Sequence, residues 1–264
     1  MEETHRLRRT FDSAADLYEA ARPSYPDELV DDLVELAGLE PGDRLLEIGC
    51  ATGKATRPLA ERGFSIVCVE LGARLAERAR QNLAGLDVDV RLAPFEEWEG
   101  DERTFALVYA ATSWHWLDPD VRYRKAHALL RPGGHLAFWS ALHAFPADAD
   151  PFFTEIQAVY DAIGERHDGD WPPPPPEQIV DDRAEIEATG LFDEVHVRRY
   201  VWELTYTADE YIELLDTFSG HRAMSESARE RLYREIRARI SARLEPSVRR
   251  HWHAILHVAR RPVD

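Results

Sequence analysis

The fold is decided by the stretch Leu45-Leu46-Glu47-Ile48-Gly49-Cys50-Ala51-Thr52-Gly53-Lys54. A short apolar segment comes first, then a turn that contains glycine, and then residues that can begin a helix. Turns of this kind bring the backbone close to a ligand at the carboxyl ends of parallel strands. Gly49 has no Cβ, so a ligand can lie against its backbone, and Gly53 can adopt angles that other residues resist. The stretch therefore predicts an α/β fold with a binding site at this turn.

The spacing of the glycines indicates which ligand is expected. The dinucleotide fingerprint requires two further glycines after Gly49, but those positions hold Ala51 and Lys54. The observed pattern is instead Glu47-x-Gly49-x-Ala51-x-Gly53, with an acid two residues before the first glycine. It resembles motif I of the class I methyltransferases, which use S-adenosylmethionine, although glycine is commoner than alanine at position 51. The resemblance implies cofactor contacts from these four residues. The alternative is an ordinary strand-to-helix turn in another α/β protein.

The composition favours a small-molecule ligand. The 264 residues are 44% hydrophobic, which is enough for one large domain with a substantial core. A net charge of −17 disfavours nucleic acid and anionic membranes, because both are bound through clustered Lys and Arg. The chain has no apolar run of membrane-spanning length and no signal-like N-terminus, so we expect a cytoplasmic protein. Cys50 and Cys68 lack metal-binding spacing, and we expect two buried thiols and no metal.

An acid also follows the second predicted strand, Phe64-Ser65-Ile66-Val67-Cys68-Val69-Glu70. A carboxylate in this position can accept hydrogen bonds from both hydroxyls of a ribose. In the methyltransferases that the chain resembles, this residue holds the ribose of the adenosyl group. The resemblance therefore assigns Glu70, and Leu71 beside it, to the cofactor. The alternative is that Glu70 caps the helix that starts near Gly72.

The next predicted turn follows the third strand, over residues 88–92. Family members often carry an acid here that accepts a hydrogen bond from the adenine amino group, but this chain has Pro94 at that position. The resemblance leaves Phe95 and Glu96 as the candidates for the adenine contact. The alternative is that Phe95 belongs to the core and that Glu96 is a solvated charge.

The fourth predicted strand ends at Ala110 and leads into Ala111-Thr112-Ser113-Trp114-His115-Trp116-Leu117. The family has its motif IV here, beside the transferable methyl group. The resemblance implies cofactor contacts from Ala110, Ala111 and Trp114, and it places Trp114 and His115 beside the substrate. His115 is the candidate catalytic base, because histidine has an ordinary pKa near neutrality. The alternative is a structural histidine.

The N-terminal segment contains the remaining candidates. Residues 11–22 are predicted to form a helix that ends at Pro23-Ser24-Tyr25-Pro26, because proline does not continue a helix. The segment resembles the cap of many small-molecule methyltransferases, which implies that Tyr18 and Arg22 bind the cofactor and that Tyr25 contacts the substrate. Arg22 offers a planar fork for a carboxylate of either molecule. The alternative is a surface helix with solvated charges.

A later phrase, Leu129-Leu130-Arg131-Pro132-Gly133-Gly134, predicts a tight turn into an apolar strand over residues 135–140. It extends the resemblance over residues 41–140, and it implies that Trp139 lies at the substrate site. We expect a single Rossmann-like domain with a doubly wound seven-stranded sheet. The resemblance gives the strand order 3-2-1-4-5-7-6, with the last strand antiparallel. The expected parts are an N-terminal cap (1–26), a cofactor-binding core (27–140), lid insertions (141–192 and 207–246) and two closing strands (193–206 and 247–260).

The predicted function is transfer of a methyl group from S-adenosylmethionine to a small molecule, with S-adenosylhomocysteine as the product. Methylation of an oxygen, in a carboxylate or a hydroxyl, is favoured. The chain resembles bacterial small-molecule methyltransferases, including the trans-aconitate type, and we expect a monomer or a homodimer. Two alternatives are an NAD-dependent oxidoreductase and a non-catalytic protein that binds a ligand or a partner on the same fold.

Overall fold

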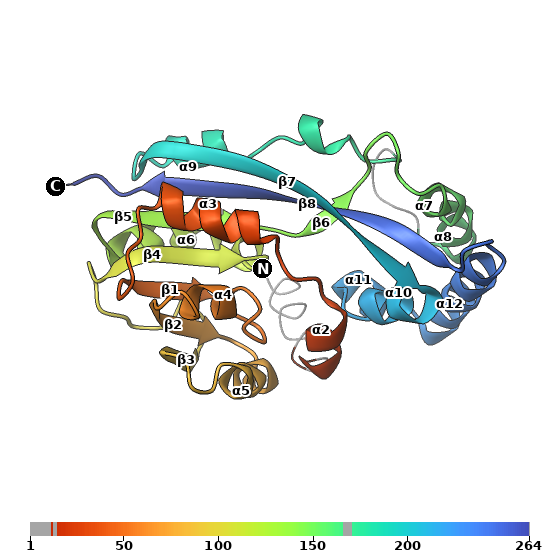
Figure 1. Cartoon of the computed structure of the whole chain (residues 1–264), viewed down its shortest axis with the longest axis horizontal. Helices are drawn as coiled ribbons and strands as arrows, with labels where there is room; N and C mark the ends of the chain where they lie inside the picture. Colours follow the sequence, from red (N-terminus) through yellow and green to blue (C-terminus); the bar gives the residue numbers. More distant parts are fainter. Residues whose placement is uncertain (1–11, 13–14, 166–170, 264) are drawn as a thin grey trace.

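The computed structural model describes residue 12, residues 15–165 and residues 171–263. Within this part, one eight-stranded sheet has the order β3-β2-β1-β4-β5-β8-β6, and β7 also pairs with β8 (Figure 1). The strands are β1 (Arg44–Ile48), β2 (Ser65–Glu70), β3 (Val88–Leu92), β4 (Phe105–Ala111), β5 (Leu130–Trp139), β6 (Leu142–Ala144), β7 (Asp193–Thr207) and β8 (Ser247–Arg260).

The order of the strands confirms the predicted fold. The first five strands are parallel, β8 is antiparallel to β5, and β7 is antiparallel to β8. Because β8 and β7 take the places of the seventh and sixth strands of the family, the predicted order 3-2-1-4-5-7-6 is reproduced. The short strand β6, which pairs with β8, was not expected from the sequence.

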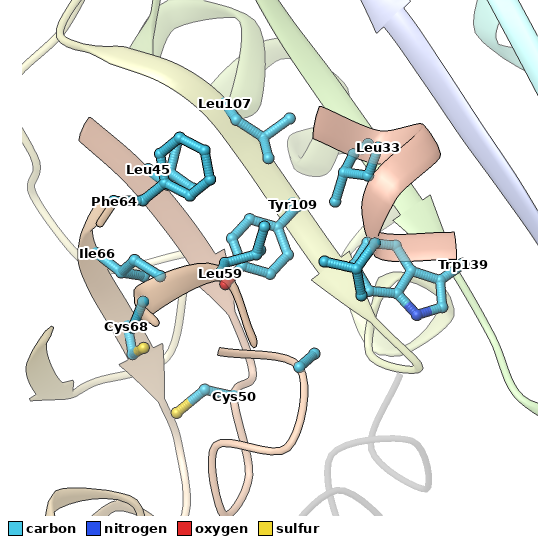
Figure 2. Close-up of a cluster of buried hydrophobic side chains, with 14 of the residues drawn as sticks. Leu33, Leu45, Cys50, Leu59, Phe64, Ile66, Cys68, Leu107, Tyr109 and Trp139 are labelled. Atoms are coloured by element: carbon cyan, nitrogen blue, oxygen red, sulfur yellow. The ribbon is translucent and has the colours of Figure 1, made fainter. Parts of the chain in front are cut away.

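Helices cover both faces of the parallel strands, as expected for strands that are apolar on both sides. The helices are α2 (Ala15–Ala21), α3 (Asp27–Leu36), α4 (Thr56–Ala60), α5 (Ala73–Asn82), α6 (Pro119–Leu129), α7 (Phe152–Glu155), α8 (Gln157–Ile163), α9 (Arg183–Ala188), α10 (Ala208–Leu215), α11 (Ser219–Ala223) and α12 (Glu226–Ser241). Side chains of α3, α4 and α5 share one core with Leu45, and side chains of α6 and α9 share another with Leu46. Successive residues of β1 thus face opposite layers. Figure 2 shows part of the first core, where Leu33 of α3 and Leu59 of α4 lie near Tyr109 and Trp139.

A third core lies among the helices α7, α8, α10 and α12. The strands β7 and β8 continue beyond the parallel strands and reach α10 and α12 at the far end of the molecule (Figure 1). Trp252 of β8 is fully buried there against residues of these four helices. The segments predicted as lid insertions therefore share an apolar interior of their own and are joined to the sheet through two long strands.

One predicted boundary differs from the structure. Strand β5 begins at Leu130 and not at residue 135, because the segment that contains Pro132 continues in extended form into the strand. Helix α10 begins with a capping box, in which the side chains of Thr207 and Glu210 bond to each other's backbone N–H groups. Within the described residues, no helix combines the length and the apolar character needed to cross a membrane.

Candidate active site

A cavity opens at the carboxyl ends of β1, β2 and β4, and α2 and the segment after α10 lie across it. A smaller pocket adjoins it on the side of α2 and shares part of its wall, including Tyr18, Arg22 and Gly49. The predicted residues in the wall of the larger cavity are Tyr18, Arg22, Gly49, Ala51, Glu70, Leu71, Phe95, Ala111 and His115. Tyr25 and Glu47 line the smaller pocket. The structure therefore brings together most of the residues that the sequence motifs single out.

Gly49 has no room for a side chain. Its φ of +71° lies in the left-handed region, and a Cβ atom would approach the Cβ of Ser113 to 2.8 Å. Its N–H donates a hydrogen bond of 2.8 Å to the carbonyl oxygen of Val69, which fixes the turn against β2. The hydroxyl of Ser113 donates to the carbonyl of Ile48 and holds the end of β4 against the same turn. The bare backbone of Gly49 thus forms part of the cavity wall, as predicted.

Glu70 joins the turns after β1 and β2. Its carboxylate accepts hydrogen bonds from the N–H of Ala51 (2.9 Å) and from the N–H of Gly72 (2.8 Å), and the residue is only 6% exposed. Burial raises the pKa of Glu70, although the backbone hydrogen bonds oppose this effect. The start of α5 has a further cap in Asp12, which accepts hydrogen bonds from the N–H groups of two α5 residues. Glu70 is therefore a carboxylate in the cavity wall, and its remaining lone pairs can serve a ligand.

Glu47 lies beneath the same turn, at 1% exposure. Its Oε2 accepts hydrogen bonds from the hydroxyls of Thr56 (2.6 Å) and Tyr109 (2.7 Å). Burial raises the pKa of Glu47 to about 7, because these two hydrogen bonds only partly replace the solvation of a carboxylate. Glu47 thus fixes the helical segment after the turn to β4, and it closes the floor of the smaller pocket.

We expect Glu47→Gln to stabilise the protein at alkaline pH. Between pH 4.5 and pH 7 the folded state binds more protons at Glu47 than the unfolded state does, so wild-type stability falls as pH rises. A neutral amide avoids this loss and keeps an oxygen for the two hydroxyls. Urea unfolding should give about 1–3 kcal/mol more stability at pH 8 and little difference near pH 4. Glu61→Gln, at an exposed glutamate, is the control. An unchanged pH dependence in Glu47→Gln would show that Glu47 is not the origin of the effect.

Arg22 and Tyr25 fix the N-terminal segment over the cavity. The Nε of Arg22 donates to Thr217 Oγ1 (2.7 Å) and its Nη2 donates to the Thr217 carbonyl (3.1 Å). Its guanidinium carbon also lies 4.1 Å from the ring centroid of Phe218. The hydroxyl of Tyr25 is hydrogen bonded to Thr112 Oγ1 at 2.8 Å. Residues that lie far apart in the sequence thus enclose the site together.

His115 lies at the mouth of the cavity, in a short 3-10 helix over Trp114–Trp116, and its side chain is exposed. Partial desolvation by the wall and the positive charge of Arg122 lower the pKa of His115. The lowered pKa favours the neutral imidazole, which can accept a proton. This is the protonation state that a general base requires.

Five predicted site residues lie outside both pockets. Gly53 packs closely against the end of α5, and an added Cβ atom would lie only 2.8 Å from Leu83. Glu96 accepts a hydrogen bond from the N–H of Asp118 at its carboxylate and a bond from Lys125 at its carbonyl. The other three residues, Ala110, Trp114 and Trp139, are buried in the cores of the sheet.

The two tryptophans are core residues because each one is stacked against an aromatic ring. Trp114 is parallel to Phe138 with a centroid distance of 5.0 Å, and Trp139 is parallel to Tyr109 at 5.9 Å. Trp139 reaches the site only indirectly, through an edge-on contact with Tyr25 at 5.5 Å. We therefore correct the assignment of both tryptophans from ligand contacts to supports of the wall.

The structure also adds wall residues that the sequence reasoning missed. Several of them are adjacent in sequence to a predicted site residue. They could have been predicted for that reason, since residues next to a ligand-binding turn usually line the same cavity. The additional residues of the larger cavity are Ile48, Val69, Leu75, Ala93, Thr112, Ser113, Trp116, Leu117, Ala141, Leu142, Phe218 and Ser219. Phe218 and Ser219 had no such signal, because only the fold brings them to the site.

These features fit an adenosyl cofactor. The turn at Gly49 admits a ligand to its backbone, and Glu70 offers carboxylate oxygens of the kind that bind ribose hydroxyls. Leu71, Leu75 and Phe95 supply apolar surface for a flat ring. The smaller pocket has charged and hydroxyl groups, with Arg22 and Tyr18 in its wall, which suit the amino-acid end of such a molecule.

Comparisons with known proteins give the same family. A family model described as a methyltransferase domain matches residues 45–134. An uncharacterized methyltransferase from Mycobacterium tuberculosis is 36% identical over 127 residues, which are 48% of this chain and 50% of that protein. This chain therefore spans about half the length of the curated relatives that it matches at this level.

Solved structures share the fold over most of the chain. A methyltransferase from Anaeromyxobacter dehalogenans, designated type II, has a TM-score of 0.63 and 24% identity, over 91% of this chain and 99% of that one. The phosphoethanolamine N-methyltransferase 2 from Haemonchus contortus, solved with phosphomonomethylethanolamine and S-adenosylhomocysteine, has a TM-score of 0.55 and 17% identity, over 95% and 57%. Residues 45–134 of this chain therefore match a methyltransferase domain, and the chain shares its fold with solved methyltransferases, one of which was solved with S-adenosylhomocysteine bound.

Proposed function

We propose that the protein transfers a methyl group from S-adenosylmethionine to an oxygen atom of a small-molecule acceptor. The observation that carries this proposal is the juxtaposition of Gly49, Glu70 and His115 in one cavity under a lid. The first two residues suit the adenosyl group, and His115 lies at the mouth, where an acceptor enters. A small-molecule acceptor agrees with the enclosed site and with the net charge of −17.

The bound cofactor would supply a methyl group from its sulfonium, and the sulfur would keep the electron pair of the carbon–sulfur bond. The residues of this chain then have to hold the acceptor oxygen in line with the methyl carbon and to exclude water. The lid segment with Phe218 and the helix with Tyr18 and Arg22 enclose the cavity. A carboxylate acceptor needs no base, whereas a hydroxyl acceptor loses its proton, for which the neutral imidazole of His115 is available.

Calorimetric titration tests the cofactor part of the proposal. We expect S-adenosylhomocysteine to bind the wild-type protein in a 1:1 complex, whereas NAD at the same concentrations does not bind. Incubation with S-adenosylmethionine and an acceptor library should then yield S-adenosylhomocysteine and products heavier by one methyl group. Binding of NAD alone would favour the oxidoreductase alternative. Cofactor binding with no turnover on any acceptor would favour the non-catalytic alternative.

We expect His115→Ala to reduce kcat for a hydroxyl acceptor by about 100-fold or more, because the proton then has no positioned base. The dissociation constant of S-adenosylhomocysteine should change little. The wild-type rate should fall at acidic pH, as the imidazole becomes protonated at a pKa that burial lowers from its ordinary value, and this dependence should disappear in the variant. Equal rates of variant and wild type, with the same pH profile, would remove His115 from the catalytic residues.

A further inference from the structure

Arg250, in β8, is a buried cation without a counterion. The residue is 5% exposed, and arginine remains charged at any pH at which proteins are folded. Within the described ranges, no carboxylate forms an ion pair with it, and its Nε has no hydrogen-bond partner. The desolvation of an uncompensated charge costs several kcal/mol. The structure therefore retains at this point a group that a bound anion would stabilise.

Other arginines of the chain show how unusual this arrangement is. Its neighbour Arg249 is half-exposed and pairs with Asp148 and Glu203. Arg261 is as buried as Arg250, but its Nη1 donates to the carbonyls of His127 and Leu130. Alternation along β8 sends Arg249 to the surface and Arg250 to the interior, on the same side as Trp252.

The surroundings of Arg250 carry donors and aromatic rings but no compensating charge. Its electrostatic neighbours are the hydroxyls of Tyr160, Tyr206 and Tyr211 and a second cation, Arg22, and its side chain is also hydrogen bonded to the neutral hydroxyl of Tyr211. Its guanidinium carbon lies 4.4 Å from the ring centroid of Trp252. A positive charge that is surrounded by neutral and cationic groups is a binding site for an anion.

Two histidines extend this polar cluster. Both His143 and His221 have their pKa values lowered, first by burial and then by the charge of Arg250. The Nε2 of His143 is buried and has no hydrogen-bond partner within the described residues. His221 is hydrogen bonded through Nε2 to the hydroxyl of Tyr160, at 2.8 Å. His143 Nε2 is therefore a second polar atom near Arg250 that is available to a ligand.

The cluster adjoins the cavity through one aromatic ring. Phe218 is part of the cavity wall, and its ring centroid lies 4.1 Å from the guanidinium carbon of Arg22 and 5.6 Å from that of Arg250. On the other side, His143 directly follows Leu142, which also lines the cavity. An acceptor in the cavity that displaces the Phe218 ring can therefore meet both cations.

We propose that the methyl acceptor is a small organic acid whose carboxylate is bound by Arg250, with Arg22 as a second cation and His143 as a further polar contact. This inference rests on the proposed function, since it names the acceptor class of the same site. The planar fork of an arginine matches the two oxygens of a carboxylate. The carboxylate that binds Arg250 orients the acceptor, and a second oxygen atom of the acceptor faces the methyl group of the cofactor.

The test uses the full-length protein loaded with S-adenosylhomocysteine, and the variants Arg250→Met, Arg250→Lys and Arg249→Met. The probes are trans-aconitate and phenylacetate, each compared with its neutral amide, and both binding calorimetry and the thermal midpoint are measured. Wild type and Arg249→Met should bind the acids and not the amides. We expect Arg250→Met to bind the acids about 10- to 100-fold more weakly, and Arg250→Lys to lie between, because it keeps the charge and loses the fork.

The ligand-free thermal midpoint separates a binding role from a structural one. A ligand-binding Arg250 has no carboxylate partner to lose, and a methionine side chain can keep the packing on Trp252, so Arg250→Met should melt at the wild-type temperature or above it. Melting well below wild type would assign Arg250 to the fold and overturn the inference. The inference would also be overturned if Arg250→Met bound the acids as tightly as wild type does, or if wild type bound neither acid. Failure of wild type to bind S-adenosylhomocysteine would instead contradict the proposed function.

Discussion

The variant Glu70→Ala is expected to bind S-adenosylhomocysteine at least about 100-fold more weakly than wild type, because hydrogen bonds to a charged group each contribute about 1.5–3 kcal/mol. Two effects add. The proposed ribose contacts are lost, and the N–H groups of Ala51 and Gly72 lose the carboxylate that holds the turns after β1 and β2 together. The cavity would then lose both a ligand contact and part of its shape.

Calorimetry on Glu70→Ala and on Glu97→Ala separates this effect from a loss of acidic charge. Glu97 is exposed on the segment after β3 and does not line the cavity, so its variant should bind like wild type. Circular dichroism checks that Glu70→Ala is folded. Wild-type affinity in a folded Glu70→Ala protein would mean that Glu70 has a purely structural role and that the ribose lies elsewhere.

Gly49→Ala is expected to destabilise the fold by about 2–4 kcal/mol and to prevent cofactor binding. The left-handed angle costs an alanine about 1–2 kcal/mol, and displacement of a packed neighbour costs about 1–3 kcal/mol more. That neighbour is Ser113, whose Cβ would lie 2.8 Å from the new methyl group. The methyl group would also occupy the wall where the ligand meets bare backbone.

Two further variants divide the effect of Gly49→Ala into its parts. Gly38 also has a left-handed φ, of +56°, but a Cβ atom there would meet nothing within 4 Å, so Gly38→Ala reports the backbone strain alone. The double variant Gly49→Ala with Ser113→Gly removes the clash and should recover part of the stability in urea unfolding. If Gly49→Ala is no less stable than Gly38→Ala, the contact with Ser113 is not limiting.

Most of the fold could be predicted from the sequence because its signals are local. The apolar strand before Gly49, the acid at Glu70 and the apolar strand after Gly134 each occur where the parallel sheet requires them. The neighbourhood of Gly49 and Glu70 was also predictable, since the ends of adjacent parallel strands meet at one edge of a sheet.

The parts of the site that could not be predicted depend on contacts between residues far apart in the sequence. Strands that are buried on both faces do not reveal by their composition which side chains point toward a ligand. For this reason Trp139 and Ala110 were placed at the site, although they face the cores. Arg250 was missed because the pair Arg249-Arg250 looks like surface charge. The alternation that leads from Arg250 to Trp252 and Leu256 was the available signal that one arginine points inward.

The two long strands β7 and β8 pair along their whole length and connect the sheet to the helices α8, α10 and α12 (Figure 1). The turns proposed to bind the cofactor follow β1 and β2, at the opposite side of the sheet. Changes in α8 or α12 are therefore expected to alter the surroundings of Arg250 and to leave the turns after β1 and β2 in place. Helix α10 is different, because it also packs against α2, which carries Tyr18 of the cavity wall. Acceptor preference and cofactor affinity should thus be separable by substitutions in α8 and α12, but not by substitutions in α10.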